Sequence, residues 1–133
     1  MNIEVFSLCD AATGDHGKLN ILGAFDTVMV EKVPATHPQC AVALRMRFDS
    51  VEEGEHKVGV NFIDANGKNI MPPVGGQVMV KLPDGRRSVS INLILNIHNI
   101  KIERPGEYSI ELAIDSRHEA SLPLYVLNPP PKR

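Results

Sequence analysis

Aromatic residues, long apolar runs and excess positive charge are all scarce in this chain of 133 residues. It has no tryptophan, two tyrosines and four phenylalanines, so few rings remain for stacking on a sugar or on single-stranded nucleic acid. No apolar run approaches the ~18 residues of a membrane-spanning helix. The net charge of -2 lacks the basic excess that phosphate neutralisation requires. We therefore expect no nucleic-acid partner and no membrane partner.

Cysteine and other metal-binding or catalytic patterns are also sparse. The two cysteines, Cys9 and Cys40, both fall in apolar, strand-like contexts. Met1 leads into a strand-like segment with no signal-peptide pattern, so we expect a cytoplasmic protein without disulfides. His37 and Cys40 supply only two of the roughly four ligands of structural zinc, and no CxxC or HxH pair is present. Without a P-loop or a nucleophile elbow, we expect no metal, no cofactor and no catalytic residue.

What the chain has instead is a repeated alternation of apolar and polar residues. In Cys40–Phe48 every second residue is large or apolar, which is typical of a strand with one buried face. The same period recurs in residues 58–62, 78–82, 91–97, 108–114 and 120–126, and no stretch sustains a helical period. The pattern predicts an immunoglobulin-like antiparallel β-sandwich of seven to nine strands. The alternative is a jelly roll, which usually needs more strands and more residues.

Glycine, proline and small polar residues mark the expected breaks between strands. We expect a loop over Ala11–Gly17, because its composition is small and turn-rich. Lys18–Val30 is long for one strand, so Gly23 should mark a bulge or bend where the chain changes partner or sheet. Val33–Pro38 reads as a crossover loop, and His98-Asn99 as a bulge or bend, because the apolar phase slips there.

The C-terminal part of the chain reads as a final hairpin. Arg104-Pro105-Gly106 forms a turn, after which Tyr108 can turn its ring inward and bond its hydroxyl backwards to a loop carbonyl. Pro123 should make the last strand an edge strand, because proline lacks the donor that a second neighbour would need. We expect one domain over residues 1–133, with residues 128–133 an extended, proline-rich tail.

One polar surface stands out as a candidate binding site. If Cys40–Phe48 pairs with Ser88–Ile97, the side chains that point outward from the two strands form a flat patch, which includes Ala43. Arginine suits the recognition of carboxylate or phosphate groups and is enriched at interfaces, although most polar sheet faces are simply solvated. The candidate binding residues of this patch are Arg45, Arg47, Asn92, Asn96 and His98.

Several motifs resemble a known family. They are Leu8-Cys9-Asp10, Gly17-Lys18-Leu19-Asn20-Ile21-Leu22-Gly23-Ala24-Phe25-Asp26, Pro34, His37-Pro38, Arg45 and Arg104-Pro105-Gly106-Glu107-Tyr108. Over nearly its whole length the chain is similar to a family of small, uncharacterised bacterial proteins with a single all-β domain. The resemblance implies an all-β fold and a bacterial cytoplasmic setting, and it implies no activity, cofactor or catalytic residue.

The sequence favours a non-enzymatic function. Our first hypothesis is a module that binds another protein or assembles with itself, because an exposed edge or flat face is the main asset of such a fold. The alternative is a small-ligand or carbohydrate-binding domain that uses the loops Thr13–Gly17, Asp64–Lys68 and Met71–Gly76. An enzyme using Cys9 or His98 is the least favoured hypothesis.

Overall fold

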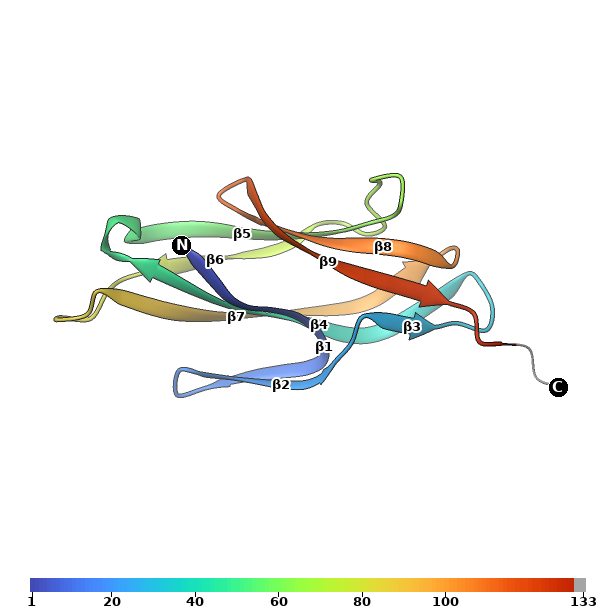
Figure 1. The fold of residues 1–133 in the computed structure, drawn as a ribbon, viewed down its shortest axis with the longest axis horizontal. Coiled ribbons are helices and arrows are strands. Elements are labelled where there is room, and N and C mark those ends of the chain that lie inside the picture. The colour runs from blue at the N-terminus through green and yellow to red at the C-terminus, as the bar shows by residue number, and fades with distance from the viewer. Residues whose placement is uncertain (131–133) are drawn as a thin grey trace.

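The computed structural model describes residues 1–130, and most of them lie in β-strands (Figure 1). A short 3-10 helix, η1 (Ser50–Glu52), is the only helical element in this part of the chain. None of the described residues form a helix with the length and apolarity to cross a membrane. The strands are β1 (Asn2–Asp15), β2 (Lys18–Ala24), β3 (Thr27–Met29), β4 (Ala35–Asp49), β5 (Gly54–Ile63), β6 (Val74–Val80), β7 (Ser88–Ile102), β8 (Gly106–Ile114) and β9 (Arg117–Leu127).

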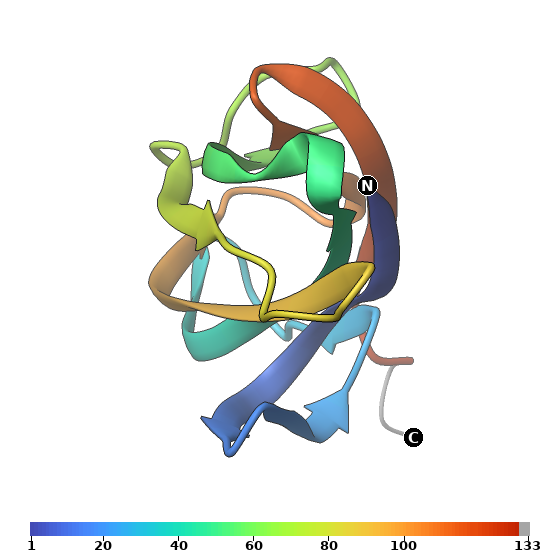
Figure 2. The same cartoon turned by 90° about the vertical axis from the view of Figure 1, so that its left-hand side faces the viewer.

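The strands form two sheets that face each other (Figures 1 and 2). The four-stranded sheet is antiparallel and has the order β2-β1-β4-β7. The five-stranded sheet has the order β3-β9-β8-β5-β6 and is mixed, because β3 runs parallel to β9. The fold is therefore an all-β, two-sheet sandwich, and the predicted pairing of Cys40–Phe48 with Ser88–Ile97 is confirmed.

The core lies between the sheets and is made by the residues that the alternation predicts to be buried. Leu44, Met46 and Phe48 of β4 are at most 1% exposed, and they face the equally buried Val60 and Leu112 of the opposite sheet. Among the described residues, no polar or charged residue is buried. Burial of apolar surface, at roughly 25 cal/mol per Å², is thus the main force that holds the sheets together.

The expectation of a loop over Ala11–Gly17 is wrong. β1 continues to Asp15 and pairs with β2, so that the two strands form a hairpin whose tip is His16-Gly17. Both tip residues have positive φ angles, 51° and 76°, as a two-residue hairpin turn requires. The small and polar residues of Ala11–Gly17 suggested a loop, although they form part of a hairpin that buries little apolar surface. We call residues 10–24 the arm.

Two strands bend where a residue adopts a left-handed backbone. Gly23 has a φ of 68° opposite Asp10, and the chain then crosses to β3 in the other sheet, which confirms the predicted change of sheet. Asn99 has a φ of 57° where β7 passes Pro38, without a shift in register. The prediction of a crossover loop over Val33–Pro38 is wrong in part, because β4 begins at Ala35 and tolerates Pro38 at this bend.

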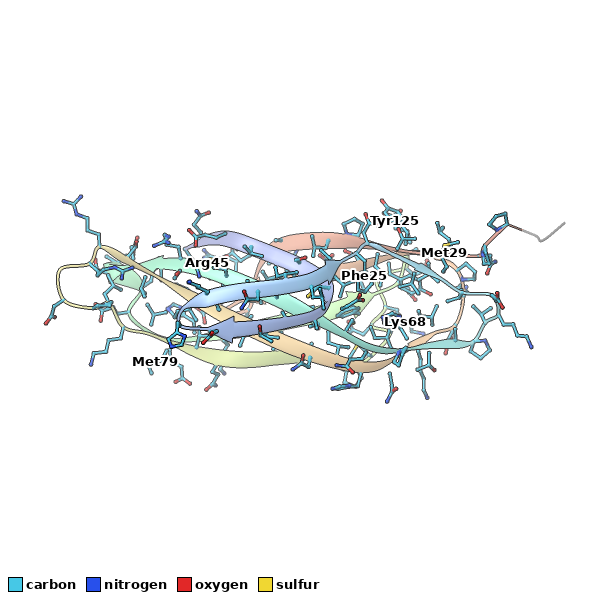
Figure 3. The ribbon with its side chains drawn as sticks, turned by 90° about the horizontal axis from the view of Figure 1, so that it is seen from below. Phe25, Met29, Arg45, Lys68, Met79 and Tyr125 are labelled. Atoms are coloured by element: carbon cyan, nitrogen blue, oxygen red, sulfur yellow. The ribbon has the colours of Figure 1, made fainter. Side chains whose placement is uncertain are left out.

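The C-terminal hairpin follows the prediction except for the place of its last strand in the sheet. Tyr108 is 5% exposed, and its hydroxyl donates to the carbonyl of Arg104 at 2.6 Å. β3 pairs with the end of β9, where Tyr125 and Met29 project outward close together (Figure 3). The expectation that Pro123 makes β9 an edge strand is therefore wrong in part: β3 is the outermost strand of this sheet, and Pro123 lies in the stretch of β9 that β3 does not reach. Asn128–Pro130 is exposed and has no regular structure, while residues 131–133 of the predicted tail lie outside the described residues.

Candidate functional site

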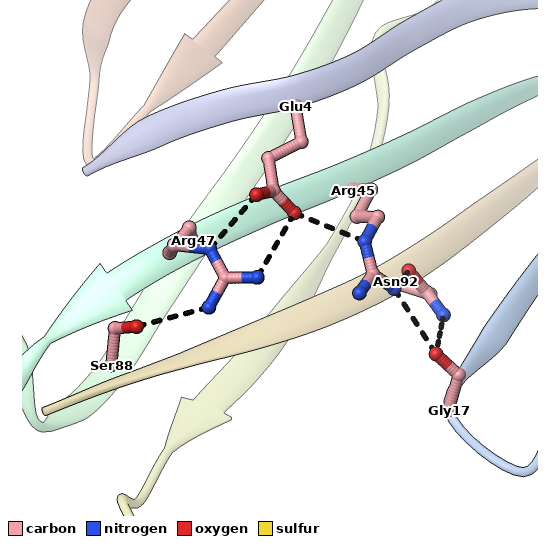
Figure 4. Close-up of polar contacts among 6 residues, drawn as sticks. All are labelled: Glu4, Gly17, Arg45, Arg47, Ser88 and Asn92. Carbon is pink, nitrogen blue, oxygen red and sulfur yellow. Dashed lines mark hydrogen bonds and ion pairs between the residues drawn. The ribbon is translucent and has the colours of Figure 1, made fainter. Parts of the chain in front are cut away.

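The two candidate arginines are bound to a single carboxylate of β1 (Figure 4). Arg45 Nε donates to Glu4 Oε1 at 3.0 Å, and Arg47 Nε donates to Glu4 Oε2 at 2.8 Å. The pairing register of β1 with β4 shifts by one residue between Ile3 and Val5, which makes Glu4 the extra residue of a bulge. Because a bulge re-aims a side chain, it explains how one carboxylate reaches both arginines. The hydrogen bond from Arg47 is the main cause that lowers the pKa of Glu4.

Arg45 also fixes the tip of the arm. Its Nη1 donates to the carbonyl of Gly17 at 3.1 Å and to Asn92 Oδ1 at 3.0 Å, and Asn92 Nδ2 donates to the same carbonyl at 3.2 Å. Arg45 and Asn92 are register partners on β4 and β7, so the arm tip lies over this pair. We call this set of contacts the latch (Figure 4).

The arm covers a small apolar patch on the outer face of the four-stranded sheet. Ala41 and Ala43 are at most 1% exposed, and they pack with the buried Cys9 against Leu19 and Ile94. Ala43 was expected on a solvated face, and this expectation is wrong because the arm lies across it. The signal was present in the sequence, since alanine rather than a charged residue occupies these outward positions.

The predicted binding row is therefore divided. Arg45 and Asn92 are tied together in the latch, and Arg47 is joined to it through Glu4. Asn96 and His98 lie farther along β7, both exposed, opposite Ala41 and Gln39. The structure thus brings three of the five candidates together, but it engages their donors within the chain.

Sequence reasoning missed the open edge of β2. This strand is the outermost of its sheet and pairs only with β1 among the described residues, so one row of its backbone groups faces outward. Leu22 is 71% exposed and Ile21 is 38% exposed. The signal that could have found it is Ile21-Leu22 itself, because two consecutive large apolar residues point to both faces of a strand.

Neither cysteine is placed for nucleophilic chemistry. Cys9 is fully buried and its thiol donates to the carbonyl of Ala41 at 3.5 Å. Burial raises the pKa of the Cys9 thiol, and burial likewise raises the pKa of Cys40 to about 11. Thiolate, the reactive form, is therefore scarce at both positions near neutral pH.

A serine, a histidine and a glutamate meet on the outer face of β8 and β9. His118 Nε2 lies 2.9 Å from Ser121 Oγ and 3.2 Å from Glu111 Oε2, and Ser121 itself donates to Glu111. In a catalytic triad the acid orients the ring nitrogen opposite the one that faces the serine. Here one ring nitrogen faces both partners, so the arrangement satisfies polar groups without activating the serine.

The three loops expected to form a ligand site do not gather. Asp64–Lys68 lines a pocket of about 360 Å³ at one end of the sandwich, together with the β7–β8 loop. Met71–Gly76 contributes no lining residue, and Thr13–Gly17 forms the end of the arm. Within residues 1–130, no three His, Cys, Asp or Glu residues are grouped so that they could hold a metal ion.

Comparison with known proteins places the chain in a family without assigning it an activity. No curated protein matches the chain. A family model described as a family of unknown function (DUF6941) matches residues 4–127, which include both strands of the arm and all the residues of the latch. The expected membership in an uncharacterised all-β family is therefore confirmed, and the chain belongs to the DUF6941 family.

Proposed function

We propose that this protein is a non-enzymatic interaction module of the bacterial cytoplasm that binds a strand of another polypeptide, or of a second copy, at the edge of β2. The observation that carries the proposal is the open edge of β2 with Leu22 71% exposed. An unpaired edge offers backbone donors and acceptors for strand addition, and neighbouring apolar side chains add affinity. The bacterial cytoplasmic setting is carried over from the sequence as a prediction.

The other edges of the sandwich are less suitable. β6 lies beside β7, the outer strand of the facing sheet. β3 has only three residues. The arm, in contrast, projects from the body of the sandwich in Figure 2, and Lys18 is the only charged residue of β2. Charges on an edge strand usually discourage pairing, and β2 has few of them.

The arginines support this function by holding the arm in place. The latch fixes the tip through Arg45 and Asn92, while Glu4 fixes Arg45. A strand-binding edge gains affinity when it is held in its binding conformation, because less freedom is lost on association. We therefore assign Arg45 and Asn92 a positioning role.

Two features support the finer proposal that the sandwich is immunoglobulin-like. β3 runs parallel to β9 at one edge, so the N-terminal part of the chain contributes to both sheets. The hydroxyl of Tyr108 bonds to the carbonyl of Arg104, four residues upstream, as in the tyrosine corner of such sandwiches.

The test is a comparison of three single variants in sedimentation and in affinity capture from the native cell extract. Leu22→Lys places a charge on the proposed edge, so it should dissociate a self-assembled form or reduce capture of a partner about tenfold or more. Val51→Lys, at a site that is 89% exposed in η1, is the matched control and should behave like the wild type.

A third variant tests the rival surface. Met29 is 53% exposed near Tyr125 and Leu127, at the β3 edge of the five-stranded sheet. If Met29→Lys abolishes association and Leu22→Lys leaves it intact, the assignment to β2 is wrong. The whole proposal is wrong if the wild-type protein stays monomeric and captures no partner whose binding Leu22→Lys reduces.

A second candidate function is the binding of a small ligand. The observation that favours it is the pocket beside Asp64–Lys68, which has the size of a small-molecule site.

A further inference from the structure

The pocket at the end of the sandwich has walls that are fixed before any ligand binds. One wall is the β5–β6 loop, where Asp64 Oδ1 accepts hydrogen bonds from the backbone N–H groups of Asn66 and Lys68, both at 2.9 Å. The other wall is the β7–β8 loop, which Tyr108 fixes through its hydrogen bond to Arg104. Pre-formed loops on a rigid scaffold are typical of ligand sites, because little ordering remains to be done on binding.

Three cationic side chains line this pocket. They are Lys68 from the first loop, Lys101 from the end of β7 and Arg104 from the second loop. All three are exposed, and none of them forms an ion pair within 4.0 Å with an acidic group of residues 1–130. Arg45 and Arg47, in contrast, are both paired with Glu4. The pocket therefore has cationic donors that the chain itself leaves available.

The same pocket also offers groups that suit hydroxyls. Asp64, Glu103 and Glu107 balance the three cations, so a highly charged polyanion is disfavoured. Asp64 is turned into its loop, and the hydrogen bond from Lys68, with the nearby charges of Lys68 and Arg104, lowers the pKa of its carboxyl. Carboxylates accept hydrogen bonds from hydroxyls, and the side-chain amides of Asn66 and Asn69, also in the lining, both donate and accept.

We propose that this pocket binds a small hydroxylated anion of the sugar phosphate class. The phosphate lies against Lys68, Lys101 and Arg104, where charge-assisted hydrogen bonds are strongest, and the hydroxyls face the carboxylate and amide groups. The proposal is independent of strand binding at β2, because the pocket shares no residue with the arm.

The experiment is an NMR titration of the isotope-labelled protein with glucose 6-phosphate. We expect amide shifts confined to residues 64–70 and 101–107, with a dissociation constant of about 1 mM or lower. The double variant Lys101→Gln/Arg104→Gln should weaken binding about tenfold or more, because it removes two cationic donors. The variant's own spectrum shows whether it remains folded.

The matched control is Arg86→Gln/Arg87→Gln, which removes the same charge from the exposed β6–β7 turn at the opposite end of the sandwich (Figure 1). This variant should bind like the wild type. Glucose should cause no confined shifts, because it lacks the phosphate. Inorganic phosphate should bind more weakly than glucose 6-phosphate, because it lacks the sugar hydroxyls. Equal binding of phosphate alone or of glucose alone overturns the assignment of class. No confined shifts at about 10 mM probe, or equal losses in both double variants, overturns the site itself.

Discussion

At the scale of single residues, Glu4 has the widest influence on the outer face. Its side chain is 28% exposed, so its ion pairs with Arg45 and Arg47 contribute little free energy individually. Their effect is geometric, because two guanidinium groups held by one carboxylate have few orientations left. Glu4 therefore orients Arg45 toward the arm tip, and it could not be predicted from the sequence because only the bulge in β1 brings it there.

Tyr108 offers a residue-scale prediction whose outcome can be compared with a core substitution. Tyr108→Phe keeps the buried ring and removes the hydrogen bond to Arg104, so it should lower the free energy of unfolding by about 1 kcal/mol. Leu112→Ala, at a residue with 0% exposure, should cost about 2–5 kcal/mol because it leaves a cavity. Chemical denaturation measures both, and a Tyr108→Phe loss as large as that of Leu112→Ala would contradict the assigned role of the hydroxyl.

At the scale of elements, the arm is the least self-sufficient part of the fold. It has one strand neighbour for β2, a small apolar patch beneath it and the latch at its tip. Elements with few buried contacts open more readily than core strands do. The backbone at Gly23 therefore matters, because it sets the angle at which the arm leaves the sandwich.

Two glycines of the arm should respond differently to substitution by alanine. Gly23→Ala should cost about 1–3 kcal/mol, because φ is 68° and a Cβ would lie 2.5 Å from Asp10 Oδ2. Gly14→Ala is the control within the same arm, where the nearest atom would be the carbonyl of Lys18 at 3.9 Å. Hydrogen exchange of the arm amides should accelerate in the first variant and stay nearly unchanged in the second; equal rates would show that Gly23 does not position the arm.

The strands that could be predicted are those with one buried and one solvated face. Alternation identified β4, β5, part of β6 and β7–β9, and the predicted pairing of β4 with β7 put Arg45 and Asn92 on the same outward face. The hairpin of the arm was not predicted, because Ala11–Asp15 is small and polar and because the consecutive Ile21 and Leu22 interrupt the alternation of β2. The contacts of Glu4 and Gly17 with Arg45 depend on a bulge and on the arm's path, which local patterns do not determine.

At the scale of the whole molecule, His56 connects the two sheets at one end. Its Nδ1 lies 2.6 Å from Asp115 Oδ2, and its Nε2 lies 2.6 Å from the carbonyl of Glu52. The ring stacks on Phe48 of the opposite sheet. With an acceptor at each nitrogen, the protonated ring is favoured, and the hydrogen bond to Glu52, followed by that to Asp115, raises the pKa of His56.

This arrangement predicts a pH-dependent stability. Because the pKa of His56 is raised on folding, its contribution is fully present below the unfolded value of about 6.5 and is lost as pH rises through the folded value. Denaturation of wild type and His56→Gln should therefore differ more near pH 5.5 than near pH 8.5. His98→Gln, at an exposed position, serves as the control. A wild-type advantage over His56→Gln that grows with pH would contradict the proposed interaction.

The carboxylate partner acts with the opposite sign. Backbone hydrogen bonding from Lys57, followed by the hydrogen bond from His56, lowers the pKa of Asp115. Its contribution is present above the unfolded value of about 3.9 and is lost as pH falls through the folded value. The pair therefore stabilises the fold only at pH values above the folded-state pKa of Asp115 and below that of His56.

The parallel pairing of β3 with β9 has a consequence for the order of folding. Thr27–Met29 has its only described strand partner in Tyr125–Leu127, which lies far along the sequence from it. The pairing cannot form until the chain has been synthesised as far as Leu127, and closing so large a loop is slow. A chain emerging from the ribosome can therefore assemble the hairpin of β1 and β2 early, while the switch of its N-terminal segment into the second sheet waits for the last strand.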